Sequence, residues 1–372
     1  QTGIADSPHE GFADMRNVII DKQAGVVEIG WRTQLVASTA VGDFVKWIIH
    51  DEVTGTAVNY YAVTDSGRLL HTGNSGDSWI TEANGLGRGQ GLRIWKDFLL
   101  VATGTAVTGW GPLSTTPLFR PNFVLLYSNN DPNNFQPFWN PVKVGQDDIV
   151  YIGDGNLINS LQEVSGQNFN AGTASTYTYG TASLDLPEGY LVKSLEELGE
   201  NLLAGTWRAS GLAGTLFEEP AIKTADIFPW DRSADSFKLP LKFGEQGINW
   251  QITIGNITYF QAGLKGRIYV TNGSSVKLVR QLPKHLTDLD GQRIIVNSPG
   301  GVMEHQGKLF FGISGSGTSG RGITDGVGVY SLDLETGALI MENQLSTGNT
   351  GGTGTDAVNI RPLPSIDQKR YF

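Results

Sequence analysis

Cysteine is missing from all 372 residues, so the chain has no disulfide framework, no thiolate nucleophile and no cysteine ligand for zinc. Charged residues are also scarce, at 17% against a typical value of about 25%. No run of Lys and Arg occurs, and the formal net charge is −10. Because nucleic-acid binding depends on clustered cations that displace counterions, we expect no sequence-specific nucleic-acid partner.

Long apolar runs and metal-binding patterns are absent as well. No stretch approaches the roughly 18 apolar residues of a membrane span, and the first residues carry no apolar signal segment. The five histidines never lie three or four residues apart, and the loop from Thr287 to Gly291 lacks the later glutamate of an EF-hand. We therefore expect a soluble chain with no membrane span, no metal and no cofactor.

Glycine and aromatic residues are abundant. The chain has 49 Gly, 9 Trp, 11 Tyr and 16 Phe, which is enough apolar material for a core and many tight turns. Its apolar runs are four to seven residues long and stop at Gly, Asn or Asp instead of continuing with a helical period. Even Leu191 to Leu202, where leucines fall at helical spacing, is interrupted by Gly199, and we predict strand, turn and strand there. The chain is expected to be all-β.

A turn residue, an apolar strand and a glycine-bearing turn recur along the chain. The strand centres lie near residues 61, 100, 150, 203, 260 and 310, so successive strands are 39 to 57 residues apart. Four-stranded propeller blades repeat about every 40 to 50 residues. A strand with a neighbouring blade on each side is buried on both faces, which explains the continuous apolar runs. We take these runs as the inner strands of the blades.

The spacing predicts a β-propeller of four-stranded antiparallel blades, with seven blades favoured and six allowed. Residues 1–13 are expected to be an N-terminal arm and residues 14–372 a single propeller domain. Asp367 to Phe372 resembles the opening of one more inner strand, and strands between Val18 and Val36 are expected to complete the ring. Alternatively, the chain is a fragment of a longer protein.

One short motif resembles the Asp box of sialidases and other propellers. Thr72, Asn74, Gly76, Ser78 and Trp79 fit its pattern, with Asn where Asp is usual. The resemblance implies a structural turn between the third and fourth strands of a blade, in which the amide caps the turn and Trp packs beneath. It implies nothing about catalysis.

We find no catalytic constellation. The Phe-Arg-Ile-Pro signature of the first sialidase arginine is absent. Carboxylate doublets such as Asp147-Asp148 and Glu196-Glu197 do not form an acid and base pair, because adjacent residues on a strand point to opposite faces. The glycine-rich Gly315 to Gly320 is not followed by the helix that a dinucleotide site needs.

Aromatic and charged residues gather at two places. Trp207 and Arg208 follow one apolar strand, and Trp230, Asp231 and Arg232 follow a rigid Phe-Pro turn. Aromatic faces stack on sugar rings and charged neighbours hold hydroxyl groups, so these residues are candidates for a glycan-binding face. Packing between blades is the alternative for the same residues.

Three stretches, Tyr151–Gly155, Phe228–Arg232 and Gly266–Gly273, resemble β-propeller structural proteins of tailed bacteriophages, and the likeness spans most of residues 14 to 372. The resemblance implies a non-enzymatic virion component of the tail nozzle, hub or fibre, with host-receptor binding as a further role. It also implies other virion proteins and copies of the same chain as partners, a host surface glycan as ligand, and location in the extracellular particle. The alternative is a secreted glycan-active hydrolase of the sialidase-like propeller type.

Overall fold

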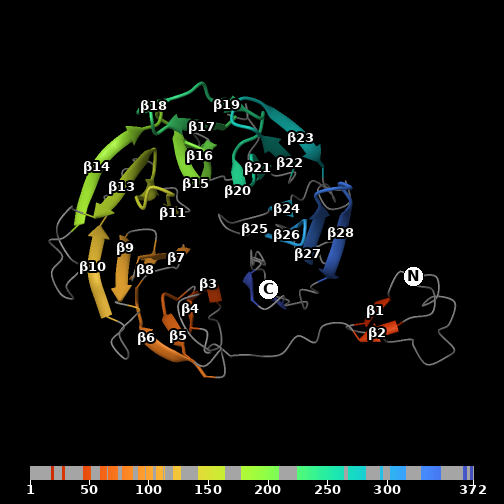
Figure 1. The fold of residues 1–372 in the computed structure, drawn as a ribbon, viewed down its shortest axis with the longest axis horizontal. Helices are drawn as coiled ribbons and strands as arrows, with labels where there is room; N and C mark the ends of the chain where they lie inside the picture. The colour runs from red at the N-terminus through yellow and green to blue at the C-terminus, as the bar shows by residue number, and fades with distance from the viewer. Residues whose placement is uncertain are drawn as a thin grey trace, which may run out of the picture.

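The structure, a computed structural model, describes residues 18–20, 27–29, 45–51, 59–64, 66–73, 78–86, 91–96, 98–103, 106–111, 113, 120–126, 141–163, 177–208, 224–263, 267–281, 294–295, 302–315, 328–344, 363–366 and 369–371. These residues form strands, turns and bends, with no α-helix among them. Six antiparallel sheets follow one another around a ring in chain order (Figure 1). The chain is therefore an all-β propeller with six blades, the number that the sequence allowed beside the favoured seven.

The first three blades are simple meanders of four strands, and their bounds are as follows. Blade 1 has β3 (Val45–Asp51), β4 (Asn59–Thr64), β5 (Leu69–Thr72) and β6 (Ile80–Ala83). Blade 2 has β7 (Gly91–Trp95), β8 (Phe98–Ala102), β9 (Ala106–Gly111) and β10 (Arg120–Leu126). Blade 3 has β11 (Val142–Val144), β12 (Val150–Asp154), β13 (Leu157–Glu163) and β14 (Tyr177–Asp185).

Blades 4 and 6 each divide one edge between two short strands. Blade 4 has β15 (Tyr190–Leu198), β16 (Asn201–Arg208) and β17 (Asp226–Asp231), and both β18 (Ser236–Phe237) and β19 (Leu241–Lys242) pair with β17. Blade 5 has β20 (Ile248–Ile254), β21 (Ile257–Ala262), β22 (Arg267–Thr271) and β23 (Val276–Arg280). In blade 6, β24 (Ile294–Ile295) and β25 (Val302–His305) pair with β26 (Lys308–Gly315), followed by β27 (Gly328–Asp333) and β28 (Leu339–Gln344).

Two small sheets stand beside the six blades. β1 (Val18–Ile20) pairs with β2 (Val27–Ile29), and β29 (Leu363–Ile366) pairs with β30 (Lys369–Tyr371). β29 also contacts β25 of blade 6 and β3 of blade 1, so the last described strands lie between these two blades. Closure of the ring by residues 18 to 36 and the domain limits at residues 13 and 14 stay predictions.

The recurring apolar runs are not the inner strands, and that part of the interpretation was wrong. β4, β8, β12, β16, β21 and β26 are each the second strand of their blade. The first strands, such as β7 and β15, lie toward the axis of the ring, and the first strands of successive blades contact one another (Figure 1). The second strand is the more apolar one because it has a strand on each edge and a blade on each face.

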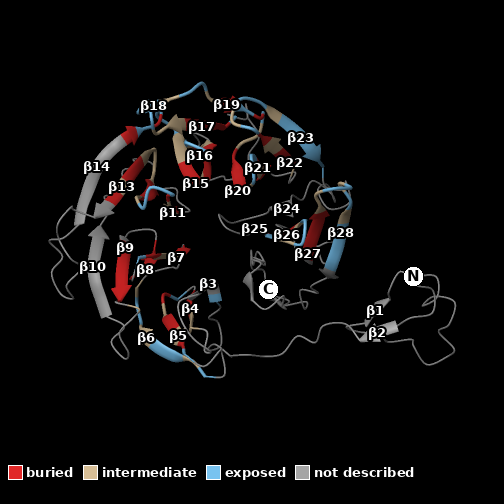
Figure 2. Ribbon diagram, viewed as in Figure 1, coloured by how far each residue is buried: buried red, intermediate tan, exposed pale blue. Residues whose placement is uncertain are grey.

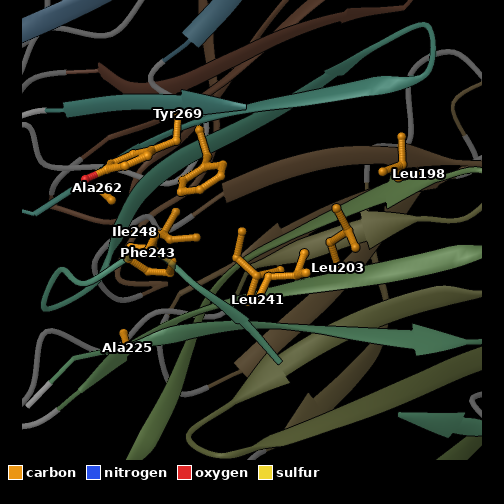
Figure 3. Packing of buried hydrophobic residues seen from close by; sticks show 10 residues of the cluster. Leu198, Leu203, Ala225, Leu241, Phe243, Ile248, Ala262 and Tyr269 are labelled. Carbon is orange, nitrogen blue, oxygen red and sulfur yellow. The ribbon is translucent and has the colours of Figure 1, made fainter. Parts of the chain in front are cut away.

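Alternating side chains of a second strand enter two different cores. In β8, Leu99 and Val101 pack with blade 1, whereas Phe98, Leu100 and Ala102 pack with blade 3. All five side chains are buried, and each large one contributes about 1.5 to 3 kcal/mol relative to exposure. Buried residues consequently fill the spaces between blades, and exposed residues lie at the outer rim (Figure 2). Figure 3 shows one such core between blades 4 and 5, where Leu203 and Leu241 approach Ile248 and Phe243.

Leu191 to Leu202 forms strand, turn and strand, as predicted. β15 pairs with β16, and the pair nearest the turn is Leu198 with Asn201. Gly199 and Glu200 therefore form the turn. Gly199 has φ +57°, a value that suits glycine at the first position of a two-residue hairpin turn. The leucines at helical spacing are thus distributed over two paired strands.

Gly153 is a close-approach point between blades 3 and 4. A Cβ atom at this residue would lie 2.7 Å from both Pro141 Cγ and Val192 Cγ1. We expect Gly153→Ala to lower the free energy of unfolding by about 1 to 3 kcal/mol, because the two blades must move apart. The control is Gly91→Ala in β7, where the nearest atom to an added Cβ is the Ala102 methyl at 3.9 Å. Equal urea-unfolding curves for the two variants would contradict the prediction.

Candidate functional site

The five predicted binding residues belong to blade 4 but lie at its opposite ends. β16 and β17 are antiparallel, and Leu202 pairs with Trp230, whereas Trp207 pairs with Leu191 of β15. Trp207 is five residues along the strand from Leu202, which corresponds to about 17 Å. Trp207 and Arg208 therefore share one end, and Trp230, Asp231 and Arg232 share the other. The structure does not bring all five residues to one face.

We call these ends the crossover end and the turn end of blade 4. The turn end carries the turns Gly199–Glu200 and Arg232–Asp235. The crossover end carries Pro187–Gly189, where the chain enters the blade, and Arg208 at the end of β16.

Asp231 is the cap of a turn. Its Oδ1 accepts hydrogen bonds from Ser233 N at 3.0 Å, Ser233 Oγ at 2.6 Å and Ala234 N at 3.2 Å, and Oδ2 lies 3.0 Å from Lys238 Nζ. The hydrogen bond from the Ser233 hydroxyl, followed by that from Lys238, holds the pKa of Asp231 well below its ordinary value. These contacts explain its conformation without a ligand.

The same cap recurs after the third strands of blades 5 and 6. Asn272 Oδ1 accepts hydrogen bonds from the backbone N–H groups of Ser274 and Ser275. Asp333 Oδ1 likewise accepts from the backbone N–H groups of Glu335 and Thr336. Such side-chain turns are typical of Asn and Asp. The predicted Asp box lies at the corresponding position in blade 1, between β5, which ends at Thr72, and β6, which follows Ser78 and Trp79. Asn74 and Gly76 lie outside the described residues, so the Asp box itself stays a prediction.

Arg232 belongs to an ion cluster with Asp147, Tyr151 and Glu197, which joins blades 3 and 4. Its Nη1 donates to Glu197 and lies 3.6 Å from Asp147 Oδ2, and its Nη2 donates to the Gly199 carbonyl at 3.0 Å. The Glu197 side chain is only 5% exposed. Because an arginine presents its donors in a fixed fork, one guanidinium can hold both carboxylates and the turn together.

Tyr151 and Gln146 complete the ion cluster from blade 3. Tyr151 OH donates to Asp147 Oδ2 at 2.7 Å, and Gln146 N lies 3.2 Å from both carboxylate oxygens of Glu197. Burial, followed by the hydrogen bond to Asp147, raises the pKa of Tyr151 well above its ordinary value. The phenol is therefore neutral at physiological pH and acts here as a donor that orients Asp147.

Trp230 lies beside this cluster. Its ring meets Tyr151 edge to face, with ring centroids 5.9 Å apart, and it packs against the core between blades 3 and 4. Its Nε1 is buried and has no hydrogen-bond partner in the described structure. Trp230 therefore contributes to packing between blades, the alternative that the sequence left open.

Trp207 is likewise a packing residue. It is 8% exposed, and a Cβ on Gly247 of the neighbouring segment would lie 2.2 Å from its ring, so the backbone passes directly over the indole. Lys193 Nζ lies 4.3 Å from its ring centroid. Because little of the side chain is exposed, the indole is poorly placed to stack on a sugar ring.

Lys193 is a buried residue that the sequence did not single out. It is 1% exposed, its Nζ lies 3.4 Å from Asn249 Oδ1, and desolvation by burial lowers its pKa to about 7. A register shift lies between Val192 and Ser194, and four consecutive residues of β15, Val192–Leu195, are buried. Since a regular strand would send alternate residues outward, no sequence pattern identifies Lys193 as buried.

Arg208 differs from Asp231 and Arg232, because its charged group forms no ion pair within the described residues. The Cζ atom lies 4.1 Å from the Tyr190 ring centroid, and Nη1 is 3.5 Å from the Glu188 carbonyl. Tyr190 OH donates to Asp226 Oδ2 at 3.1 Å, and burial, followed by this hydrogen bond, raises the Tyr190 pKa. Within the described part of the chain, no carboxylate lies at ion-pair distance from Arg208.

Two other expectations concern metals and membranes. No group of three or more His, Asp or Glu among the described residues could hold a metal ion. The loop Thr287 to Gly291 and most of Gly315 to Gly320 lie outside those residues. No helix suited by length and apolar character to crossing a membrane occurs in the described residues.

Comparisons with known proteins support the fold alone. No family model and no curated protein matches the chain. The Cps50 (Swd1) β-propeller domain from Myceliophteria thermophila superposes with a TM-score of 0.50 at 9% identity, over 82% of this chain and 90% of that domain. The computationally designed Ika8 protein gives 0.45 at 10% identity, covering 87% and 91% of the two chains. BamB from Moraxella catarrhalis gives 0.41 at 12% identity, covering 78% and 74%.

Proposed function

We propose that the chain is a non-enzymatic binding and assembly propeller, a structural component of a bacteriophage tail. The observation that carries the proposal is how the carboxylates at the turn end of blade 4 are occupied. Glu197 and Asp147 share Arg232, while Glu196 binds Lys143 and Asp231 binds Lys238. Carboxylates held this way fasten one segment to another, so their oxygens are engaged in structural contacts.

The tail assignment rests on the resemblance of Tyr151–Gly155 and Phe228–Arg232 to phage propellers. Both stretches meet at the contact between blades 3 and 4, where Tyr151 and Phe228 share one core. A rigid ring with exposed outer strands such as β23 is suited to a place among other particle proteins and copies of itself. Location in the extracellular particle follows from this role.

Quantitative mass spectrometry of purified tailed particles tests the proposal. We expect the chain to be present at a fixed number of copies per particle and to stay attached through a density gradient. Electron microscopy with antibodies against the chain should then label the tail. A chain found only as free protein outside the particles contradicts the tail role.

A glycan-active hydrolase is the second candidate, and Asp154 is the observation in its favour. This residue ends β12, and desolvation by burial raises the pKa of its carboxyl group to about 6. A carboxyl group with such a pKa is suited to general acid catalysis near neutral pH. Its side chain accepts no hydrogen bond from any described residue.

A panel of chromogenic glycosides separates the two candidates. Under the hydrolase hypothesis, Asp154→Asn should reduce turnover at least 100-fold, while Asp185→Asn on the exposed end of β14 should leave it unchanged. That pattern would overturn the non-enzymatic proposal. Lack of turnover by the unmodified protein, or turnover equal in the two variants, would count against Asp154 as an acid.

A further inference from the structure

We propose that Arg208, held on Tyr190 at the crossover end of blade 4, is a binding subsite for the carboxylate of an acidic sugar. The inference rests on the binding role proposed above and gives that role a ligand class. It concerns one of the five sequence candidates, and it assigns no sugar contact to Trp207, which is buried, or to Trp230, which is partly buried.

The guanidinium is held in place before any ligand arrives. Arg208 N donates to the Gln246 carbonyl at 2.9 Å, and the residue pairs with Tyr190 across β15 and β16. The side chain then lies over the Tyr190 ring, which also meets the Phe228 ring edge to face, with ring centroids 4.9 Å apart. Because the side chain is already ordered, little conformational entropy remains to be lost on binding.

Within the described residues, no carboxylate forms an ion pair with Arg208, in contrast to two other arginines of blades 4 and 5. Arg232 binds Glu197 and Arg267 binds Glu245, whereas Asp226, beside Tyr190, accepts from Tyr190 OH at 3.1 Å. Of the guanidinium donors, Nη1 has one long contact to a carbonyl, Nε is buried without a hydrogen-bond partner, and Nη2 has no hydrogen bond within the described residues. Among these residues, the positive charge and the Nη2 donor thus have no anionic partner at a half-buried position.

Gly189, which has no side chain, lies beside the guanidinium. Gly189 has φ +82°, and a Cβ there would lie 3.7 Å from both Cζ and Nη1 of Arg208. Any side chain at residue 189 would therefore contact the guanidinium. Pro187, Glu188 and Gly189 are all exposed, so this side of Arg208 borders solvent.

One unpaired guanidinium on an acidic protein favours a singly charged ligand. Arginine binds a carboxylate through two parallel N–H···O bonds. The net charge of −10 disfavours polyanions such as nucleic acids, which need several cations at once. A carboxylate attached to a neutral sugar ring meets both conditions.

The test uses ligand-observed NMR with glucuronic acid, glucose and N-acetylglutamate on the full chain. We expect millimolar binding of glucuronic acid and at least tenfold weaker binding of glucose. Arg208→Gln should weaken glucuronic acid binding at least tenfold, and Arg208→Lys by less. Arg280→Gln, which removes an exposed arginine on β23, should have no effect. Urea unfolding of Arg208→Gln should match the unmodified protein and thereby exclude misfolding as the cause.

The outcomes separate the subsite from the proposed function. Equal binding of glucose and glucuronic acid, stronger binding of N-acetylglutamate, or full affinity in Arg208→Gln overturns the acidic-sugar subsite. None of these results affects the tail assignment, which depends on presence in particles. A chain absent from particles that still binds glucuronic acid through Arg208 retains the subsite and loses the tail role.

Discussion

With Lys193 replaced by methionine, the protein is expected to gain about 2 to 4 kcal/mol of unfolding free energy at pH 7. Lys193 is buried between blades 4 and 5, where its amino group meets the Trp207 ring and the Asn249 amide oxygen. Methionine keeps a similar length and is readily buried. The contact with the indole offsets part of the desolvation cost, so the gain should stay below the limit of about 5 kcal/mol set by the pKa difference.

The effect has a defined pH window. The pKa of Lys193 is about 7 in the folded chain and 10.5 for an ordinary lysine, and desolvation is the cause. Between these values the unfolded chain binds a proton that the folded chain does not, so stability rises with pH. The penalty is fully present below pH 7 and disappears as the pH approaches 10.5. The gain from Lys193→Met should therefore shrink steadily over this range.

Urea unfolding at pH 7, 8, 9 and 10 measures both effects. Lys277→Met, at an exposed position of β23, is the control and should leave the stability and its pH dependence unchanged. A loss of stability in Lys193→Met at pH 7, or a gain that does not change with pH, would show that the buried amine is not the cause.

Replacing Arg232 by methionine is expected to lower the free energy of unfolding by about 3 to 5 kcal/mol. The change leaves Glu197, which is almost fully buried, without its cation, and it also removes the donors to the Gly199 and Glu200 carbonyls. Breaking a buried pair on one side is costly because the remaining charge stays buried. The contact between blades 3 and 4 should loosen first.

The double variant Arg232→Met with Glu197→Gln separates charge from packing. Since it removes both charges, it should recover part of the loss relative to Arg232→Met alone. Lys238→Met, which breaks the more exposed ion pair with Asp231 in the same turn, is the control and should cost less than about 1 kcal/mol. Chemical unfolding of the unmodified protein, Arg232→Met, Glu197→Gln and the double variant gives the coupling energy. If the double variant were as unstable as the sum of its parts, an unpaired charge would not be the origin of the loss.

The fold could be predicted because the second strand of each blade is covered on both faces. Strands such as β8 and β16 read as continuous apolar runs, and their spacing reveals the blade length. The sequence does not show whether such an apolar run is the first, second or third strand of its blade, because any strand buried on both faces has the same apolar pattern. The first strands near the axis, such as β7 with Arg93, mix polar and apolar residues and are less conspicuous.

The number of blades was harder to predict, for a related reason. One more strand after residue 310 was expected to open a seventh blade. Instead β29 and β30 form a two-stranded sheet that contacts blades 1 and 6. A single apolar strand has the same local pattern in a full blade and in a two-stranded sheet.

The candidate site depended on pairings that local sequence does not contain. Trp207-Arg208 and Trp230-Asp231-Arg232 look alike in sequence, yet antiparallel pairing sends them to opposite ends of blade 4. The partners of Arg232 come from β15 and from the turn before β12, which only the contact between blades brings together. The sequence indicates Arg208 only by its place beside a tryptophan. Its contact with Tyr190 and the absence of a counter-ion among the described residues are features of the fold.

The sharing of each second strand between two cores bears on how the ring comes apart. Leu99 and Val101 face one neighbour while Phe98 and Leu100 face the other, so losing blade 2 would strip apolar cover from blades 1 and 3 together. No blade in such an arrangement can unfold alone at low cost, because its loss exposes apolar residues of both neighbouring blades. The ring should accordingly behave as a single cooperative unit, unlike an open stack of repeats that can fray inward from its ends.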